Sequence, residues 1–394
     1  MKRGKVLISG GLGFIGLQVA KLLVQQKQDV LLFDNLSSQI HGPLPSLSSL
    51  QLLKDPHIEV VRGDVCKGED WETALSGVSS LIHLAAATGT AQSMYEIARY
   101  TETNVGGTAN LFNYLANRKH DVSKVILASS RSVYGEGAYS CECCGPVYPP
   151  ARSKEMLSEG KWDPSCPGCG GSLTAMATGE DARTSPASIY AATKLAQEDI
   201  VRIGGQALGI PAVIFRFQNV YGEGQSLKNP YTGILSIFSN QMRLGKAIDL
   251  YEDGLESRDF VHVSDVARAV VMGITSDRAD GYTLNVGSGQ PTSVQAIALL
   301  LKECIGCDAQ PVVSGHYRVG DIRHGYADLA AIGERLGFEP EVSLEAGIER
   351  FVEWVMTQAV EPDRLGLAAQ ELSDRGLMRR GATHGVSPSS AWSK

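Results

Sequence analysis

A glycine-rich loop near the N-terminus constrains the fold more than any other feature of this chain. The apolar run Lys5–Ser9 breaks into GGLGFIG, and apolar residues then recur at helical spacing over residues 12–23. Later apolar runs at Leu81–Leu84 and Val125–Ala128 are also followed by small or polar residues. Strands separated by helical stretches are typical of a doubly wound parallel sheet. The sequence therefore predicts an α/β fold of the Rossmann type.

The glycine loop has the spacing of a dinucleotide-binding site. Gly10, Gly13 and Gly16 let the backbone turn sharply and approach a pyrophosphate at the start of the following helix. The next apolar strand ends in Asp34, whose carboxylate suits the ribose hydroxyls of adenosine. The same charge would repel a 2′-phosphate, and no Lys or Arg lies within residues 28–53. NAD is therefore favoured over NADP. The weaker alternative is that Asp34 only caps a turn.

Two later motifs supply a candidate catalytic set. Ser130 follows a predicted strand in SSRSVYG, and in SIYAATK Tyr190 and Lys194 share one face of a helix. A tyrosine that acts as a base at neutral pH needs its pKa lowered by about 3 units, which an adjacent ammonium and an oxidised nicotinamide can supply. Ser130 would hydrogen-bond the same substrate hydroxyl. Singly, such residues usually serve packing or solvation; together they predict oxidation of an alcohol.

Over about residues 4–356 the chain resembles the extended short-chain dehydrogenase/reductases, and within them the nucleotide-sugar epimerases and dehydratases. The resemblance rests on GGLGFIG, FDNLS, HLAA, SSRSVYG, YAATK and RDFVHVSDVA. It implies that Ser130, Tyr190 and Lys194 are the catalytic triad and that NAD is tightly bound. We also expect a homodimer. The implied cofactor contacts are Gly10, Gly13, Phe14, Ile15, Gly16, Asp34, Asn35, Asp64, Val65, Leu84, Ala85, Ala86, Asn104, Tyr190 and Lys194.

The resemblance also implies groups that hold the diphosphate of a sugar nucleotide. Asn219 in FRFQNVYG, Arg258 in RDFVHV and Arg318 in YRVGD occupy the matching positions. Guanidinium forks suit diphosphates, although surface salt bridging is the alternative for Arg318. Lys228 and Arg323 are weaker candidates. The predicted substrate contacts are Ser93, Ser130, Arg131, Asn219, Arg258, Arg318 and Asp321.

The residues after the catalytic serine bear on the reaction. Family members that eliminate water usually carry Asp-Glu there, whereas this chain has Arg131 and Ser132. The resemblance thus implies epimerisation at the sugar C4 through a 4-keto intermediate. The stretches around Ser93 and SSRSVYGEG, with the cysteine-containing insertion, are most similar to bacterial dTDP-L-rhamnose 4-epimerases. A UDP-hexose 4-epimerase and a dehydrogenase or reductase with net redox remain alternatives. A non-catalytic Rossmann scaffold has no reason to keep the triad together.

Two cysteine pairs interrupt this pattern between Ser130 and Tyr190. Cys141 and Cys144 form CxxCG, and Cys166 and Cys169 form CPxCGG. This is zinc-ribbon spacing, and four thiolates leave no open position, so we predict a structural zinc site. Cys143 is a bystander or a substitute ligand. Disulfides are disfavoured in a reducing compartment, and unliganded thiols do not explain the spacing.

Composition narrows the partners. The net charge is −7, and the insertion is neither basic nor rich in aromatic residues, so neither nucleic acid nor an anionic membrane is expected. The start MKRGKVLISGG carries too short an apolar run for a signal peptide or membrane span, so we expect a cytoplasmic protein. A small-molecule nucleotide sugar is the expected partner.

We expect four parts along the chain. Residues 1–138 and 172–222 form the NAD-binding domain, and residues 139–171 form the zinc-ribbon-like insertion. Residues 223–360 bind the sugar nucleotide, with 264–290 returning to the sheet. Residues 361–394 are expected to be a flexible polar tail.

Overall fold

The large sheet organises the molecule. A computed structural model describes residues 4–42, 51–229, 231, 233–363 and 365–382. Within them a parallel sheet of seven strands has the order β13-β9-β5-β4-β1-β2-β3, so the chain reverses direction across the sheet between β1 and β4. The strands are β1 Lys5–Ser9, β2 Val30–Asp34, β3 Ile58–Arg62, β4 Val78–His83, β5 Lys124–Ser130, β9 Ala212–Phe217 and β13 Thr283–Val286. The predicted Rossmann-type sheet is confirmed.

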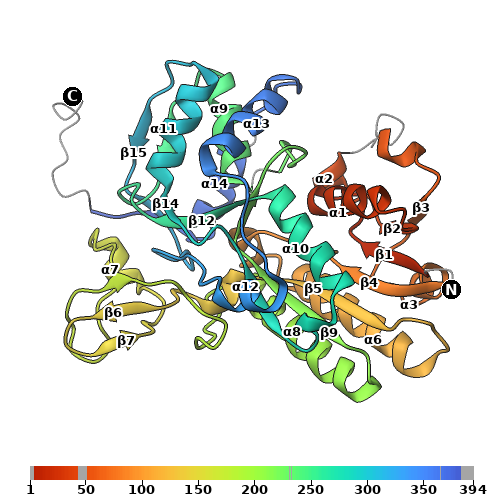
Figure 1. Ribbon diagram of the computed structural model, residues 1–394. Coiled ribbons are helices and arrows are strands. Elements are labelled where there is room, and N and C mark those ends of the chain that lie inside the picture. Colours follow the sequence, from red (N-terminus) through yellow and green to blue (C-terminus); the bar gives the residue numbers. More distant parts are fainter. Residues whose placement is uncertain (1–3, 43–50, 230, 232, 364, 383–394) are drawn as a thin grey trace.

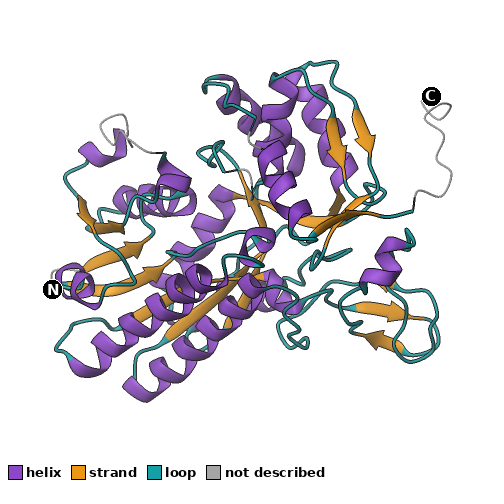
Figure 2. Ribbon diagram, turned by 180° about the vertical axis from the view of Figure 1, so that it is seen from behind, coloured by secondary structure: helices purple, strands orange, loops and turns teal. Residues whose placement is uncertain are grey.

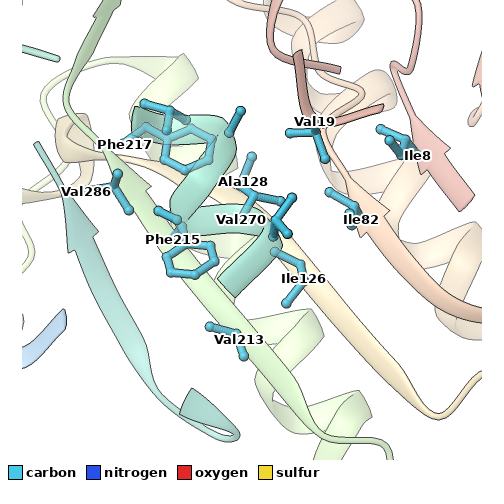
Figure 3. Packing of buried hydrophobic residues seen from close by; sticks show 14 of the residues in the cluster. Ile8, Val19, Ile82, Ile126, Ala128, Val213, Phe215, Phe217, Val270 and Val286 are labelled. Atoms are coloured by element: carbon cyan, nitrogen blue, oxygen red, sulfur yellow. The ribbon is translucent and has the colours of Figure 1, made fainter. Parts of the chain in front are cut away.

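Helices cover both faces of this sheet. Its strands carry apolar residues on both faces, and burying both faces requires a helical layer on each side. In β1, Ile8 packs toward one core and Leu7 toward the other. The first core lies under α1 (Phe14–Gln25), α10 (Val263–Thr275) and α12 (Ala330–Leu336), and Figure 3 shows Val19 and Val270 packed against strand residues. The second core lies under α3 Gly68–Ala74, α6 Gly107–Asn117 and α8 Ile189–Leu208.

A second lobe follows β9 and stands above the carboxyl end of the sheet (Figure 1). Its core joins α9, α11 and α13 through Phe238, Ile297 and Phe351. Segment 283–286, in the stretch expected to return to the sheet, is edge strand β13. The lobe's elements are α9 Ile234–Arg243, α11 Val294–Ile305, α13 Leu344–Met356, β10 Asn219–Tyr221, β11 Ile248–Leu250, β12 Ser257–His262, β14 Pro291–Ser293 and β15 Pro311–Val313.

The cysteine-bearing insertion forms a small separate sheet. In Figure 1 it lies below the second lobe, on the opposite side of the molecule from β1–β3, and Figure 2 shows the same separation from behind. Its sheet has the order β7-β6-β8, and a short helix follows β7. These elements are β6 Tyr139–Cys141, β7 Gly145–Val147, α7 Lys154–Ser158 and β8 Thr174–Ala175.

The C-terminal segment is folded as far as it is described. Helix α14 (Leu365–Asp374) buries Ala368 and Leu372, and β17 (Met378–Arg380) pairs antiparallel with β16 (His316–Arg318). The prediction of a flexible tail from residue 361 is therefore wrong for this part, because an apolar stripe and a strand partner anchor it. Residues 383–394 of that prediction lie outside the described residues.

The remaining described elements are short. They are the helices α2 Ser38–His41, α4 Thr90–Ser93 and α5 Ile97–Tyr100, the 3-10 turns Gln51–Lys54, Arg131–Tyr134 and Asp277–Ala279, and the π-helical turn Thr101–Gly106. In the part of the chain with described coordinates, we find no helix whose length and apolar character would let it traverse a lipid bilayer.

Candidate active site

A cavity of about 450 Å³ runs along the carboxyl ends of the central strands. The glycine loop after β1 and Asp34 at the end of β2 line one part of it, and Ser130, Tyr190 and Lys194 line another. In an open parallel sheet this edge, where the strand order reverses, is the usual place for a ligand. The cavity therefore joins the predicted cofactor loop to the predicted catalytic residues.

The glycine loop is as tight as its sequence predicts. Gly10 has φ +68°, and a Cβ there would lie 2.9 Å from the backbone N of Ala85. A Cβ on Gly16 would lie 2.6 Å from the carbonyl oxygen of Gly10. Gly13 caps helix α1 without a side-chain hydrogen bond, so the first N–H groups of the helix are left for another acceptor. These residues fit the pyrophosphate of a dinucleotide.

Asp34 is buried at the rim of this loop. Its two carboxylate oxygens accept the backbone N–H groups of Leu12 at 3.1 Å and of Leu36 at 2.8 Å. These bonds hold the carboxylate between the glycine loop and the chain after β2, where it also lines the cavity. A carboxylate in this place can accept hydrogen bonds from ribose hydroxyls. The glycine loop and the Asp34 carboxylate therefore fit NAD.

Most of the predicted cofactor residues line the cavity, and two do not. Asn104 is fully buried, and its amide bonds both the N–H and the carbonyl of Ala87, so it does not line the cavity and its cofactor contact stays a prediction. It shapes the cavity through Ala87, which does line it. Asp64 lies beside the lining and accepts a hydrogen bond from Asn35. The predicted residues that line the cavity are Gly10, Gly13, Phe14, Ile15, Gly16, Asp34, Asn35, Val65, Leu84, Ala85, Ala86, Tyr190 and Lys194.

The three catalytic candidates come together from two elements, β5 and α8. Ser130 ends β5 and caps the next turn, accepting the N–H of Ser132 at 3.2 Å. Tyr190 and Lys194 lie in the first turns of α8, one helical turn apart. The Lys194 ammonium donates to the carbonyl of Ala128 at 2.9 Å, which ties the helix to β5. Ser130, Tyr190 and Lys194 therefore face one space.

Burial dominates the ionisation of these groups in the protein alone. It raises the pKa of Tyr190, while a hydrogen bond with Ser130 and the charge of Arg131 act in the lowering direction. It lowers the pKa of Lys194 to about 7, against the charge of Glu198. The lowered tyrosine pKa is predicted for the enzyme with an oxidised nicotinamide bound, and it stays a prediction; in the protein alone, desolvation disfavours the charged forms of both side chains.

Two predicted substrate residues lie outside the cavity lining. Ser93 is fully buried, and its hydroxyl donates to the carbonyl of Thr90 and accepts the N–H of Tyr190 at 3.0 Å. In this structure Ser93 holds the start of α8, and its substrate contact stays a prediction. Asn219 begins β10 beside Val220, and Val220 is the one of the two that lines the cavity.

The predicted diphosphate residues form a cluster outside the lined cavity. The Arg258 guanidinium is buried and donates to the carbonyls of Ser257, Ile322 and Arg323. Arg318 pairs with Asp321 at 2.8 Å, and the charge of Arg318 is the main cause that lowers the Asp321 pKa against the effect of burial. Asp321 therefore orients an arginine.

Arg131 differs from these arginines. Among the described residues, no hydrogen bond or ion pair joins its guanidinium to another side chain or to the backbone. Burial lowers its pKa to about 9, and the charge of Arg258 acts in the same direction. A guanidinium in this state gains from a bound anion. It lies next in the chain to Ser130, at the catalytic end of the cavity.

Sequence reasoning missed several residues that line the cavity. Arg99 and Gln39 both line it, and the Arg99 guanidinium donates to the amide oxygen of Gln39 at 2.9 Å. Arg99 also pairs with Glu96 at 2.5 Å. The sequence argument considered only the cations within residues 28–53. It therefore missed Arg99, which folding brings to the cavity from the segment after β4. No local pattern marks Arg99, since its place depends on the turn at α5.

The four predicted cysteine ligands converge. The sulfur atoms of Cys141, Cys144, Cys166 and Cys169 all lie within 4.8 Å of one another, while Cys143 is exposed and outside the group. The N–H groups of Cys144 and Cys143 act to lower the pKa of Cys141, and those of Cys169 and Gly168 act to lower the pKa of Cys166. Gly145 and Gly170 follow the two turns with φ of +72° and +73°. Two matching turns thus present four thiols to one point.

The fold and cavity are those of the dinucleotide-binding α/β class. The model of the NAD-dependent epimerase/dehydratase family matches residues 6–159 and 170–287, and the chain belongs to this family. It is an enzyme of the NAD-dependent epimerase class. The gap in the match, 160–169, falls within the cysteine-bearing insertion.

Three known proteins illustrate the similarity. A dTDP-L-rhamnose 4-epimerase from Burkholderia thailandensis is 39% identical over 364 residues, which are 91% of this chain and 96% of that protein. The UDP-glucose 4-epimerase of Thermotoga maritima, solved with UDP-glucose, is 28% identical with a TM-score of 0.72 and covers 89% of this chain and 98% of its own. MoeE5, solved with UDP-glucuronic acid and NAD, is 26% identical with a TM-score of 0.70 and covers 90% and 99%.

Proposed function

We propose that this enzyme epimerises a nucleoside-diphosphate sugar at C4 through a transient 4-keto sugar, and that it converts dTDP-L-rhamnose to dTDP-6-deoxy-L-talose. The observation that carries the reaction is that Ser130, Tyr190 and Lys194 line the same cavity as the glycine loop and Asp34. The relative that is 39% identical over 91% of the chain supports the particular sugar.

The catalytic residues have distinct roles in this reaction. Tyr190 receives the proton of the C4 hydroxyl and later returns one to the 4-keto oxygen. Ser130 hydrogen-bonds the same oxygen, and Lys194 holds the start of α8 against the Ala128 carbonyl. NAD, when bound by the glycine loop and Asp34, supplies the hydride acceptor and a positive charge that lowers the tyrosine pKa. The 4-keto sugar rotates to present its other face while its diphosphate stays bound.

The turn after Ser130 disfavours dehydration. Its next two residues are Arg131 and Ser132, and the Ser132 hydroxyl donates to the Ser130 oxygen at 3.0 Å. The nearest carboxylate in the following residues, Glu136, is engaged by Arg152 at 3.1 Å. Elimination across C5 and C6 needs an acid and a base beside the sugar, and this turn supplies neither. Reversible oxidation at one carbon fits the residues present.

A uronic acid sugar is the second candidate, and Arg131 is the observation that favours it. A carboxylate at C6 would pair with the guanidinium that has no described partner, whereas the methyl group of rhamnose would not. The other anion that could pair with Arg131 is the phosphate group nearest the sugar. The sugar panel below separates these alternatives, because a uronic acid substrate would epimerise and the deoxysugar would not.

We propose in addition that the four cysteines bind one structural zinc ion. Their sulfurs lie close enough to share an ion, and backbone N–H groups of Cys169 and Gly168 help lower the pKa of Cys166 to about 6, which favours its thiolate. Zinc takes four thiolates in a closed tetrahedral site, so the metal would order the insertion without joining the reaction. Four cysteines leave no coordination position for a substrate.

The test of the function is a sugar panel followed by NMR. The protein is incubated with NAD and with dTDP-L-rhamnose, UDP-glucose or UDP-glucuronic acid in deuterated buffer. Inversion at C4 of dTDP-L-rhamnose without deuterium at C4 is the expected result, because the hydride returns internally. Deuterium at C3 or C5 would contradict the mechanism, and net accumulation of NADH would indicate a dehydrogenase. The homodimer and the cytoplasmic location stay predictions, the first of which sedimentation measures.

A further inference from the structure

One buried arginine joins the insertion to three other segments of the chain. Arg152, which lies between β7 and α7, has a side chain only 1% exposed. It donates to Glu136 at 3.1 Å and pairs with Glu252 at 2.8 Å. It also donates to the carbonyls of Trp162 at 2.9 Å and of Asp321 at 3.0 Å. The last bond reaches the loop after β16, which carries the Arg318–Asp321 pair.

A second buried arginine repeats this link from the other side. Arg323 donates to Asp163 of the insertion at 2.7 Å and pairs with Glu252 at 3.1 Å and Asp253 at 2.7 Å. Its backbone N–H donates to Glu136 at 2.8 Å. One carboxylate, that of Glu136, therefore holds both the Arg152 side chain and the Arg323 backbone. Loop 321–323 is fixed by the insertion and by the residues that lead into it.

The same loop holds the arginines predicted to bind the diphosphate. The carbonyls of Ile322 and Arg323 accept hydrogen bonds from Arg258 at 2.7 and 2.9 Å. The Asp321 carboxylate accepts from Arg318 at 2.9 Å. A shift of this loop would therefore move the partners of both arginines at once. The insertion is remote from the glycine loop. Two successive contacts, from Arg152 to loop 321–323 and from that loop to Arg258 and Arg318, link it to the predicted diphosphate residues.

The antiparallel pair of β16 and β17 adds a contact of the same kind. The N–H of Ala382 donates to the carbonyl of Ser158 in the insertion at 2.9 Å. The ring of Trp162 packs 6.2 Å from that of Tyr317, which lies beside Arg318. The insertion therefore contacts the strand before the loop as well as the loop itself.

We propose that Arg152 is a positioning residue for the nucleotide-sugar site, through which the cysteine-bearing insertion holds loop 321–323 and so orients Arg258 and Arg318. The inference rests on the proposed function, since it takes these arginines to bind a diphosphate. It assigns the insertion a role in substrate affinity and none in cofactor binding. Arg152 itself touches neither.

The test measures the binding of dTDP and of NAD to the full chain by calorimetry. We expect Arg152→Met to raise the Kd for dTDP about tenfold or more while the Kd for NAD changes less than twofold. The KM for the sugar nucleotide rises in parallel, with kcat changed less than KM. Arg152→Lys restores part of the affinity, because it returns the charge without the fork. Lys161→Met is the matched control, because its ion pair with Glu159 is exposed, and it leaves both affinities unchanged.

Each of the other outcomes contradicts either the inference alone or the proposed function as well. Equal dTDP affinity in wild type and Arg152→Met removes the inference and leaves the function standing. An equal loss of NAD affinity assigns Arg152 a general structural role, which also overturns it. A wild type that binds neither dTDP nor UDP removes the proposed function and the inference together. If Arg152→Met does not fold, Asp163→Asn decides: its side chain is 70% exposed, so folding persists, and an unchanged Kd for dTDP overturns the inference.

Discussion

The cofactor cavity and the arginine cluster beside it are built in different ways. Gly10, Asp34 and Lys194 are set by the strand or helix that carries each one and by backbone hydrogen bonds. Arg258 and Arg318 depend on a loop that is held by Arg152 and Arg323 from distant parts of the chain. The first site is a property of the sheet, and the second is a property of contacts between loops.

This difference predicts how each region responds to a change. A buried ion pair contributes little net stability when it is complete, but removing one partner leaves a buried charge and costs about 3–5 kcal/mol. Backbone hydrogen bonds at a strand end have no such partner to lose. We therefore expect the arginine cluster to fail at single substitutions in residues that do not touch the substrate. The cofactor cavity should respond to changes in its own lining and in the buried residues, such as Asn104 and Ser93, that bond directly to that lining.

The largest expected effect comes from a change in the cysteine-bearing insertion, which supports the arginine cluster. Cys166→Ser should remove zinc, whose binding to four thiolates is worth on the order of 10 kcal/mol in small zinc domains. We expect about one zinc ion per chain in wild type and none in the variant, measured by metal analysis on the purified protein. Thermal unfolding should begin at a lower temperature, and the Kd for NAD should stay unchanged.

Cys143→Ser is the matched control for the zinc site. Cys143 is exposed and lies outside the four-sulfur group, so its replacement leaves the zinc content intact. Zinc lost equally from both variants would mean that the ligand set includes Cys143. Wild-type protein without zinc would contradict the metal site itself.

The second effect tests the catalytic end of the cofactor cavity. Tyr190→Phe removes the group that exchanges the proton, and such a loss lowers kcat by about a thousandfold, which is roughly 4 kcal/mol. The affinity for dTDP should not change, because Tyr190 lies outside the arginine cluster. Tyr134→Phe is the control: its hydroxyl bonds Asn285, and it does not line the cavity. A comparable fall in both variants would assign Tyr190 to packing.

The parts predicted from the sequence are those whose signal is local. GGLGFIG, the strand ending in Asp34 and the Tyr190–Lys194 spacing each lie within a short stretch, and the sheet brings them together in a known order. The two cysteine pairs belong to the same class. Helix α14 also had a local signal, since Ala368 and Leu372 are four apart, but the polar end of the chain obscured it.

The rest could not be predicted because it depends on which loops meet. Arg323 reads as a phosphate candidate, yet it is saturated by Asp163, Glu252 and Asp253. Arg152 carries no motif at all. Ser93 and Asn104 occupy family positions, and both are fully buried and bond neighbouring backbone groups, which the sequence did not indicate. A residue type can be read from a sequence, whereas the partners that use up its donors cannot.

A third, smaller effect comes from a carboxylate within the arginine cluster. Glu256 is 8% exposed, and one of its oxygens has no hydrogen-bond partner among the described residues. Burial raises its pKa to about 7, against the charge of Arg258. The folded state therefore holds a proton that the unfolded state releases near pH 4.5, so this group lowers stability as pH rises from about 4.5 to 7.

Glu256→Gln should remove that dependence. We expect the variant to be more stable than wild type by roughly 2 kcal/mol at pH 8, with the difference vanishing near pH 4.5. Urea unfolding at both pH values measures it. Glu303→Gln on the exposed face of α11 is the control and should show no pH-dependent difference. A variant less stable than wild type at pH 8 would mean that Glu256 is a charged partner of Arg258 in the folded protein.

The smallest effect returns to the cofactor cavity and separates it from the arginine cluster. Asp34→Asn keeps an acceptor for one of the two N–H groups, of Leu12 and Leu36, but removes the charge. Because hydrogen bonds to a charged acceptor are about twice as strong as neutral ones, we expect the Kd for NAD to rise about tenfold, or 1.4 kcal/mol. The affinity for NADP should fall less, since the repulsion of its 2′-phosphate is also lost. Asp29→Asn is the control, because Asp29 is exposed and directly precedes the same strand. If Asp34→Asn weakened dTDP binding as much as NAD binding, the two regions would be one coupled site, and the separation between a cavity set by the sheet and a cluster set by loops would not hold.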